Sequence, residues 1–346
     1  TTDTTDTAPA ADTKTDGKTY KVAMICDSSI NDGGWGAACY NAMVAAAEKK
    51  GWQTEVTDSI SQDSYYDSIV AYCALGYDMI YAPGNQYTDA VLQAAEEYPD
   101  VAFALLNGAV DTPEKAVNKN VSSLLPNAQQ IGWIAGALAG LMTETGKLGF
   151  IGGMDLPIIN DFLIGYIEGA QYINPDIKVA VAYAGTFVDS AKGKELALAQ
   201  INQQKVDVEF AAASTTGVGA LEAAYESGKC AIGVDGDQEA AFRDTNPGLA
   251  DAIKTSMLKR VDMSLLRAVK LAEEGTLPWG TCESVGLAED SVGVVIDGML
   301  TKTLSAEQME KITEAIAKVK AGEITITSAM NMDPADFAKI VEKVAP

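Results

Sequence analysis

Short apolar runs alternate with helix-length segments from residue 19 onward, and this alternation limits the fold more than any other feature of the sequence. The run at 22–26 has the length and composition of a strand that is covered on both faces, and the alanine-rich segment 37–49 predicts a helix. Strands that alternate with helices form parallel sheets through right-handed crossovers. The sequence therefore predicts an α/β protein with doubly wound parallel sheets.

The alternation occurs in two series of similar pattern, which predicts two lobes. The first series continues with strands at 53–57, 77–82, 101–106 and 121–125 and helices at 65–75 and 87–98. The second series has helices at 128–142, 158–172, 191–203 and 217–227 and strands at 148–151, 179–183, 206–211 and 231–234. The length of 346 residues agrees with two lobes, because single hydrophobic cores stop growing at about 250 to 300 residues.

The pattern changes after residue 250. A short strand near 252–255 leads into an amphipathic helix at 257–274, followed by a strand-like run at 292–296 and helices at 306–320 and 334–344. We expect this tail to cross back to the first lobe and then return. The expected N-terminal lobe is 18–125 plus 257–291, and the expected C-terminal lobe is 126–256 plus 292–346.

Residues 1–17 are expected to form a disordered tether. Thr and Asp dominate this stretch and large apolar side chains are almost absent, so burial cannot offset the entropy of ordering it. No initiator Met or signal segment precedes it, which suggests trimming after a targeting segment. A solvated spacer of this kind suits a surface-anchored protein, and the stretch would equally suit an ordinary disordered tail.

Charge and residue usage disfavour several classes of function. The net charge of −23 opposes binding to nucleic acid or to anionic lipid. Histidine is absent, which removes the commonest general base and metal ligand at neutral pH. The five cysteines are scattered without CxxC spacing and are expected to be buried free thiols. The longest apolar stretch, at 131–142, falls short of the about 20 residues that span a membrane.

Aspartates gather in the loops that follow the expected strands, where open α/β sheets bind their ligands. They are Asp27, Asp32, Asp155, Asp161, Asp189, Asp235 and Asp237, with Asn31 among them. This charge would repel a phosphate, and the spacings GxxxxGK[ST] and GxGxxG do not occur, so no nucleotide cofactor is expected. Carboxylates and amides can instead accept hydrogen bonds from a sugar or a nucleoside.

Two aromatic residues and one lysine sharpen this hypothesis. Trp35 and Phe187 lie in loops of the two series and would sandwich a planar ring from opposite walls; the alternative is that one or both are core residues. Lys259 falls in the first turn of the expected helix 257–274, where an exposed cation opposes the helix macrodipole by about 0.3 to 1 kcal/mol. A carboxylate such as Asp235 or a ligand hydroxyl would compensate this charge; the alternative is a solvated lysine.

Paired aspartates would also suit an enzyme that hydrolyses glycosidic bonds, which needs two carboxylates about 5 to 9.5 Å apart. The loops hold more Asp than Glu, and no apolar pocket that would raise the pKa of one carboxyl is identifiable. A binding protein is therefore the leading hypothesis and an enzyme the alternative.

Several stretches of the chain resemble the basic membrane protein family of ABC-transporter substrate-binding lipoproteins, which includes bacterial purine nucleoside receptors. They are DSSINDGGW, KLGFIGGMDLPIINDFLIGYIEGAQYINPDIKV, GTFVDSAKGKELA, CAIGVDGDQ and TSMLKRVD. Their order and spacing extend over nearly the whole folded chain. The resemblance implies a type I periplasmic-binding-protein fold, with two doubly wound parallel-sheet lobes around a central cleft. It also implies a lipid tether to the outer face of the cytoplasmic membrane and delivery of nucleosides to a permease.

The resemblance implies a role for each residue singled out above. Trp35 takes the place of a ring-stacking Phe, and Phe187 matches the second stacking aromatic. Asp235 would accept hydrogen bonds from the ribose hydroxyls, and Lys259 looks like the family's ribose-contacting lysine.

In the first lobe, the resemblance places Asp27 and Asn31 in the binding loop. The chain departs from the family pattern at two positions. Gly36 stands where the family commonly has Asn, and Asn107 stands where it has a base-reading Asp at the end of the fourth strand. An ionised Asp only accepts hydrogen bonds whereas Asn also donates them, so the second departure concerns selectivity among bases.

We therefore expect a lipid-anchored, monomeric receptor that is not an enzyme and that closes its two lobes around a nucleoside, with purines favoured. Its partners would be this ligand and an ABC-transporter permease, and no metal, cofactor or nucleic acid is expected. The alternatives are a binding protein for another flat or sugar-like ligand, such as a flavin or a sugar, and a nucleoside hydrolase or glycosidase with paired Asp.

Overall fold

The computed structural model describes residues 19–31, 34–108, 119–274, 276–277 and 279–346, and these form two compact units. The first unit takes its described residues from 19–31, 36–126 and 261–285, and the second from 34–35, 127–260 and 286–346. The expected tether at 1–17 and Asp32 lie outside the described residues.

The first unit contains one six-stranded sheet in the order β11-β5-β4-β3-β1-β2, with every neighbouring pair parallel. Its strands are β1 (Lys21–Ile25), β2 (Gln53–Thr57), β3 (Met79–Pro83), β4 (Ala102–Leu106), β5 (Val121–Pro126) and β11 (Cys282–Val285). Its helices are α1 (Trp35–Lys50), α2 (Tyr65–Ala74), α3 (Thr88–Glu97) and α10 (Val261–Glu273), with short 3₁₀ turns η1 (Gln62–Ser64) and η2 (Asn85–Tyr87). Buried side chains such as Ile25, Ile80 and Phe103 join the strands to α2 and α3 in one core.

The second unit contains a six-stranded sheet in the order β12-β10-β9-β8-β6-β7, in which β12 alone is antiparallel to its neighbour. Its strands are β6 (Lys147–Gly152), β7 (Lys178–Tyr183), β8 (Val208–Ala212), β9 (Cys230–Asp235), β10 (Ile253–Lys259) and β12 (Val292–Val294). Its larger helices are α4 (Ala128–Met142), α5 (Pro157–Ile173), α6 (Ser190–Ala199), α7 (Ser214–Glu226), α12 (Ala306–Lys320) and α13 (Pro334–Val344). Shorter ones are the π-helix η3 (Gln200–Gln204), α8 (Gln238–Arg243), α9 (Pro247–Ala252) and α11 (Met299–Thr303).

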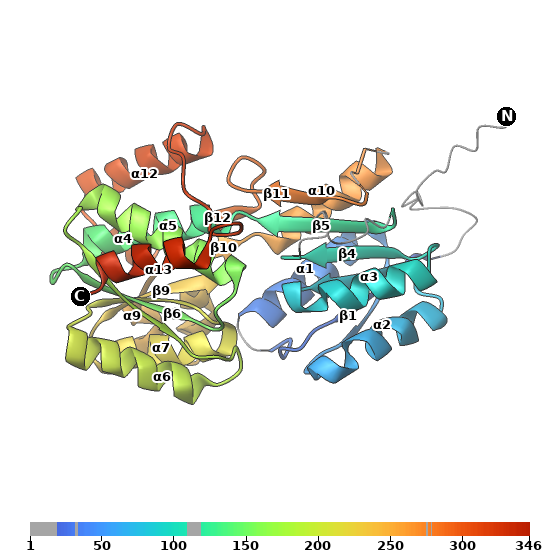
Figure 1. Cartoon of the computed structure of the whole chain (residues 1–346), viewed down its shortest axis with the longest axis horizontal. Coiled ribbons are helices and arrows are strands. Elements are labelled where there is room, and N and C mark those ends of the chain that lie inside the picture. Colours follow the sequence, from blue (N-terminus) through green and yellow to red (C-terminus); the bar gives the residue numbers. More distant parts are fainter. Residues whose placement is uncertain (1–18, 32–33, 109–118, 275, 278) are drawn as a thin grey trace. The chain divides into compact units, whose positions relative to one another are not determined.

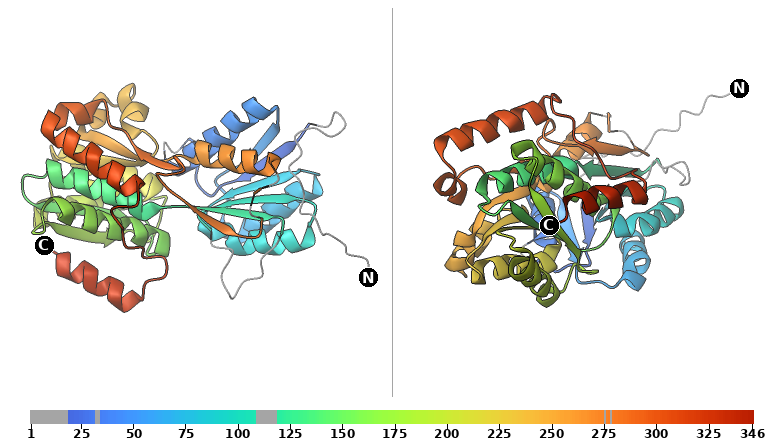
Figure 2. Two further views of the ribbon diagram at one scale, coloured as in Figure 1. Left: turned by 90° about the horizontal axis from the view of Figure 1, so that it is seen from above. Right: turned by 60° about the vertical axis from the view of Figure 1, so that its left-hand side comes forward.

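Helices cover both faces of the second sheet. Figure 1 shows α4 and α5 on one face and α6 and α7 on the other. Helices α4 and α5 pack at backbone distance, because a Cβ on Gly132 would clash with the carbonyl oxygen of Phe162 and a Cβ on Gly136 with that of Tyr166. At the end of the chain, α12 packs against α4 and α13 lies beside β7 (Figure 2).

The expected architecture of two doubly wound, mainly parallel sheets is confirmed. The expected boundary between strand 252–255 and helix 257–274 is wrong, because β10 runs to Lys259 and α10 begins only at Val261. The strand continues because β10 is paired on both sides, with β9 and with β12. Strand β11 and the short helices α8, α9 and α11 were not expected.

Two further features bear on the class of protein. All five cysteines are free thiols, three of them buried and two half-buried. Within the part of the chain that the structure describes, no helix is both long enough and apolar enough to cross a membrane.

Candidate ligand site

Each sheet has a point where the strand order reverses, and ligands of open α/β sheets bind at the carboxyl ends of the strands beside such a point. In the first unit this point lies between β1 and β3, and in the second unit between β6 and β8. Most of the residues that the sequence singles out lie at the carboxyl ends of strands of these two sheets.

Asp27 follows β1 in the first unit and is held by three side-chain hydrogen bonds. Tyr65 Oη and Gln86 Nε2 donate to Asp27 Oδ2 at 3.1 and 2.9 Å, and Ser28 Oγ donates to Oδ1 at 3.3 Å. The backbone N–H of Asp27 donates to Tyr87 Oη at 2.7 Å. Burial, and next the charge of Asp27, raises the pKa of both tyrosines, so their hydroxyls remain donors and acceptors at neutral pH. The carboxylate is thus fixed in orientation, and Oδ1 retains acceptor capacity for a ligand.

Asn107 follows a strand of the first unit and has a buried acceptor atom without a hydrogen-bond donor among the described residues. It follows β4, is only 9% exposed, and adopts a left-handed backbone conformation with φ of 64°. Its N–H donates to Leu124 O at 2.9 Å, but its Oδ1 accepts no hydrogen bond from any described residue. A buried acceptor without a donor costs about 1 to 3 kcal/mol, so a ligand donor at this atom would recover stability. Asn31, by contrast, is exposed, and its N–H donates to Ser29 Oγ at 3.2 Å.

Lys259 ends β10 in the second unit and is enclosed by aromatic rings. The prediction that Lys259 lies in the first turn of a helix is wrong, because it is the last residue of a strand. Its charge therefore does not oppose a helix macrodipole. The side chain is buried, with 7% exposed, and Nζ lies 4.7 Å from the ring centroid of Trp35 and 4.8 Å from that of Phe162. Both distances fall within the about 6 Å at which a ring face attracts a cation. The two ring faces therefore stabilise part of the positive charge of Lys259.

Asp161 precedes Phe162 on α5 and is almost fully buried. Its Oδ2 accepts from the Gln129 N–H at 3.0 Å, and its Oδ1 accepts from Ser328 Oγ at 2.7 Å and the Ala329 N–H at 2.8 Å. Burial raises the pKa of this carboxyl, while the hydrogen bonds and the charge of Lys259 oppose that rise. These bonds show that Asp161 anchors the segment before α13 to α5, which is a structural role.

Asp235 ends β9, the neighbour of β10. Its φ is 67° and it is 8% exposed, and the strand register places it opposite Leu258, next to Lys259. The turn after it is fixed by Gln238, whose Oε1 accepts from the Val234 N–H at 2.9 Å. Asp235 and Lys259 therefore occupy adjacent strand ends, with opposite charges.

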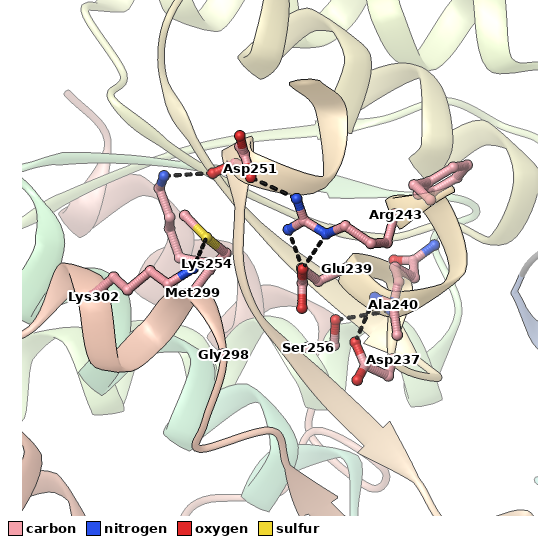
Figure 3. A network of polar contacts seen from close by, with 12 residues as sticks. Asp237, Glu239, Ala240, Arg243, Asp251, Lys254, Ser256, Gly298, Met299 and Lys302 are labelled. Atoms are coloured by element: carbon pink, nitrogen blue, oxygen red, sulfur yellow. Dashed lines mark hydrogen bonds and ion pairs between the residues drawn. The ribbon is translucent and has the colours of Figure 1, made fainter. Parts of the chain in front are cut away.

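Other aspartates of the same loops are used by the fold. Asp237 caps α8 by accepting from the Ala240 N–H at 3.1 Å, and Figure 3 shows this contact beside the pairs of Arg243 with Glu239 and Asp251. Asp189 caps α6 in the same way, and Asp155 accepts from Asn160 Nδ2 at 2.8 Å. The acidic character of these loops is thus partly a matter of helix capping.

Phe187 lies in the loop between β7 and α6, half-buried, at the reversal point of the second sheet. A Cβ on Gly153, which directly follows β6, would clash with its ring. The loop is pinned by the fully buried Thr216, whose Oγ1 donates to Thr186 O at 3.1 Å and accepts from the Asp189 N–H at 2.9 Å. The aromatic ring is therefore presented by a rigid loop.

The expected site residues divide between the two units. Trp35 contacts Lys259, and Asp235 ends the neighbouring strand; Phe187 belongs to the same unit. Residues 27, 31 and 107 belong to the first unit. The sequence did not single out Phe162, which has the pattern of an ordinary core residue of an apolar helix. It also did not single out the hydroxyls of Tyr65, which directly follows η1, and of Tyr87, which ends η2. The described residues include no group of three or more Cys, Asp or Glu that could hold a metal ion.

A family model described as ABC transporter substrate-binding protein PnrA-like matches residues 19–329. Basic membrane protein D of Borreliella burgdorferi is 31% identical over 299 residues, which cover 85% of this chain and 83% of that protein. The ABC transporter nucleoside-binding protein BmpA of Lactococcus lactis is 28% identical over 327 residues, with 89% of each chain covered.

Among solved structures, an ABC transporter solute-binding protein from Aeropyrum pernix matches with a TM-score of 0.80 and 25% identity, covering 94% of this chain and 97% of that one. A second solute-binding protein, from Conexibacter woesei, has a TM-score of 0.72 and 20% identity, covering 90% of this chain and 99% of that one. The second similarity shows the fold alone.

Proposed function

Because the chain belongs to the family of PnrA-like ABC-transporter substrate-binding proteins, we propose that it binds a nucleoside and delivers it to a permease. The observation that carries the proposal is the buried Lys259 ammonium, which lies over the ring of Trp35 and ends the strand next to the one that Asp235 ends. The nucleoside-binding name of the Lactococcus lactis relative supports the same ligand class.

The chemistry of these residues suits the two ends of a nucleoside. A carboxylate at Asp235 accepts from two ribose hydroxyls, and the Lys259 ammonium donates to a ribose oxygen. The rings of Trp35 and Phe187 offer faces to a base, which stacks on aromatic side chains with about 1 to 3 kcal/mol per base. Asn107 donates and accepts, so it would pair with a base edge that presents one donor and one acceptor.

We further propose that the protein works outside the cytoplasm as a lipid-anchored monomer and catalyses no reaction. Substrate-binding proteins hold their ligand and release it unchanged. Incubation with each nucleoside, followed by chromatography, tests this part: intact nucleoside is expected, and release of free base would make the protein a hydrolase.

Calorimetric titration with adenosine, guanosine, inosine, cytidine and uridine tests the ligand class. At least one nucleoside should bind, and the Lys259→Met variant should bind it about 10- to 150-fold more weakly. This factor corresponds to the loss of a hydrogen bond to a charged group. Lys311→Met, which removes an exposed lysine on α12, is the matched control and should leave affinity unchanged. Absence of binding by all five nucleosides would reject the proposal.

A further inference from the structure

We propose that Phe162 is a positioning residue of the ligand site, whose ring holds the Lys259 ammonium in the orientation that meets the ligand. The inference rests on the proposed function. Lys259 Nζ lies 4.8 Å from the Phe162 ring centroid, and Phe162 is only 2% exposed, so the phenyl ring acts through the lysine rather than on the ligand.

The ring is held rigidly by the core of the second unit. The backbone carbonyl of Phe162 packs so closely against Gly132 of α4 that a Cβ on Gly132 would clash with it. On the sheet side its centroid is 6.2 Å from that of Phe210 in β8. The ring therefore has a fixed place relative to the strand ends.

The side chain of Lys259 needs such a support, whereas its backbone is already held by the sheet. The backbone of Lys259 is fixed by pairing with Val292 in β12, and Leu258 before it pairs with β9. The side chain has four further rotatable bonds, and ordering them costs entropy. With Trp35 at 4.7 Å and Phe162 at 4.8 Å, two ring faces restrict the ammonium before any ligand arrives.

The residue before Phe162 adds charge to this support. Asp161 is 2% exposed, and its interaction with Lys259 is among the influences that lower the pKa of its carboxyl against the effect of burial. The Ser328 hydroxyl and the Ala329 N–H stabilise the ionised carboxylate through hydrogen bonds of 2.7 and 2.8 Å. Helix α5 thus supplies both a ring face and a negative charge to the buried ammonium.

Fluorination of the ring separates a cation–π role from simple packing. Mono-, di- and trifluorophenylalanine would be placed at position 162 by codon suppression, since fluorine withdraws electron density from the ring face while nearly preserving its shape. Affinity for the tightest-binding nucleoside should fall stepwise, by about 3- to 30-fold in total, with the upper bound set by a desolvated cation–π contact. The same series at Phe103, a buried ring in the core of the first unit with no described cation over it, is the matched control and should leave affinity unchanged.

A double-mutant cycle links the effect to the lysine. In a Lys259→Met background, fluorination at position 162 should no longer change affinity. Equal affinities along the wild-type series, or the same losses in the Lys259→Met background, would overturn the inference.

A readout without ligand keeps the inference distinct from the proposed function. The Lys259 ε-methylene protons should show ring-current shifts in the NMR spectrum of the free protein, and Phe162→Leu should move them toward ordinary values. If these shifts are unaffected by Phe162→Leu, the inference fails whatever the ligand is. If they respond and no nucleoside binds, the contact by which Phe162 holds Lys259 stands, and only the proposed ligand class is rejected.

Discussion

Glu209 is the second residue of β8 and has 0% of its surface exposed, and its replacement by Gln is expected to stabilise the protein at neutral pH. Neither carboxyl oxygen accepts a hydrogen bond from any described residue. Its Oε2 and the Oε1 of Gln200 both occupy the space that a Cβ on Gly149 would fill. Two acceptors that face each other repel, whereas a protonated carboxyl or a Gln amide can donate to the oxygen of Gln200.

The sign of the pH effect follows from burial, which raises the pKa of Glu209 well above its ordinary value of 4.5. The folded protein therefore keeps a proton that the unfolded chain releases. The contribution of Glu209 to the free energy of unfolding is fully present below pH 4.5, and it is lost as the pH rises from there through the pKa of Glu209 in the folded protein. While the folded carboxyl stays protonated, the loss is about 1.4 kcal/mol per pH unit.

Urea denaturation of the wild type and of Glu209→Gln, at half-unit intervals from pH 4 to pH 7.5, measures this difference. The two proteins should have similar free energies of unfolding near pH 4, and the variant should gain about 1.4 kcal/mol for each unit above about pH 5. Glu310→Gln, on the exposed face of α12, is the control and should show no such trend. A difference between wild type and Glu209→Gln that is constant with pH would refute the reasoning.

Two other substitutions test separate parts of the second unit. Asp161→Ala leaves three hydrogen-bond donors without their acceptor. It should lower the free energy of unfolding by about 2 to 4 kcal/mol and make the segment 322–333 more sensitive to proteolysis. An unchanged melting temperature would contradict this. Gly153→Ala should displace the Phe187 ring and weaken nucleoside binding about tenfold in calorimetry, within the energy range of base stacking; unchanged affinity would remove this ring from the site.

The architecture could be predicted from the sequence because its signals are local. Strands such as β1 and β8 are short apolar runs, and α4 and α5 are long segments free of proline after their first turn. The boundary at Lys259 could not be predicted in the same way. Met257, Leu258 and Lys259 all favour helices, and the strand continues only because two neighbouring strands pair with it.

The sequence predicts which loops carry the candidate residues, and their contacts could not be predicted in the same way. Asp235 and Trp35 were singled out because each follows an expected strand, and loops at the carboxyl ends of parallel strands bind ligands. The approach of Lys259 to Phe162 joins residues 97 positions apart, 259 minus 162, and depends on how α5 packs on the sheet. The buried Glu209 stands in the middle of a strand expected from the sequence, where its charge was the overlooked signal.

A crystal structure of the protein with its tightest-binding nucleoside tests the central claim most directly. It should show ribose hydroxyls within hydrogen-bonding distance of Asp235 and Lys259, and a base stacked on Phe187 or Trp35. A nucleoside bound away from these four side chains would contradict the account.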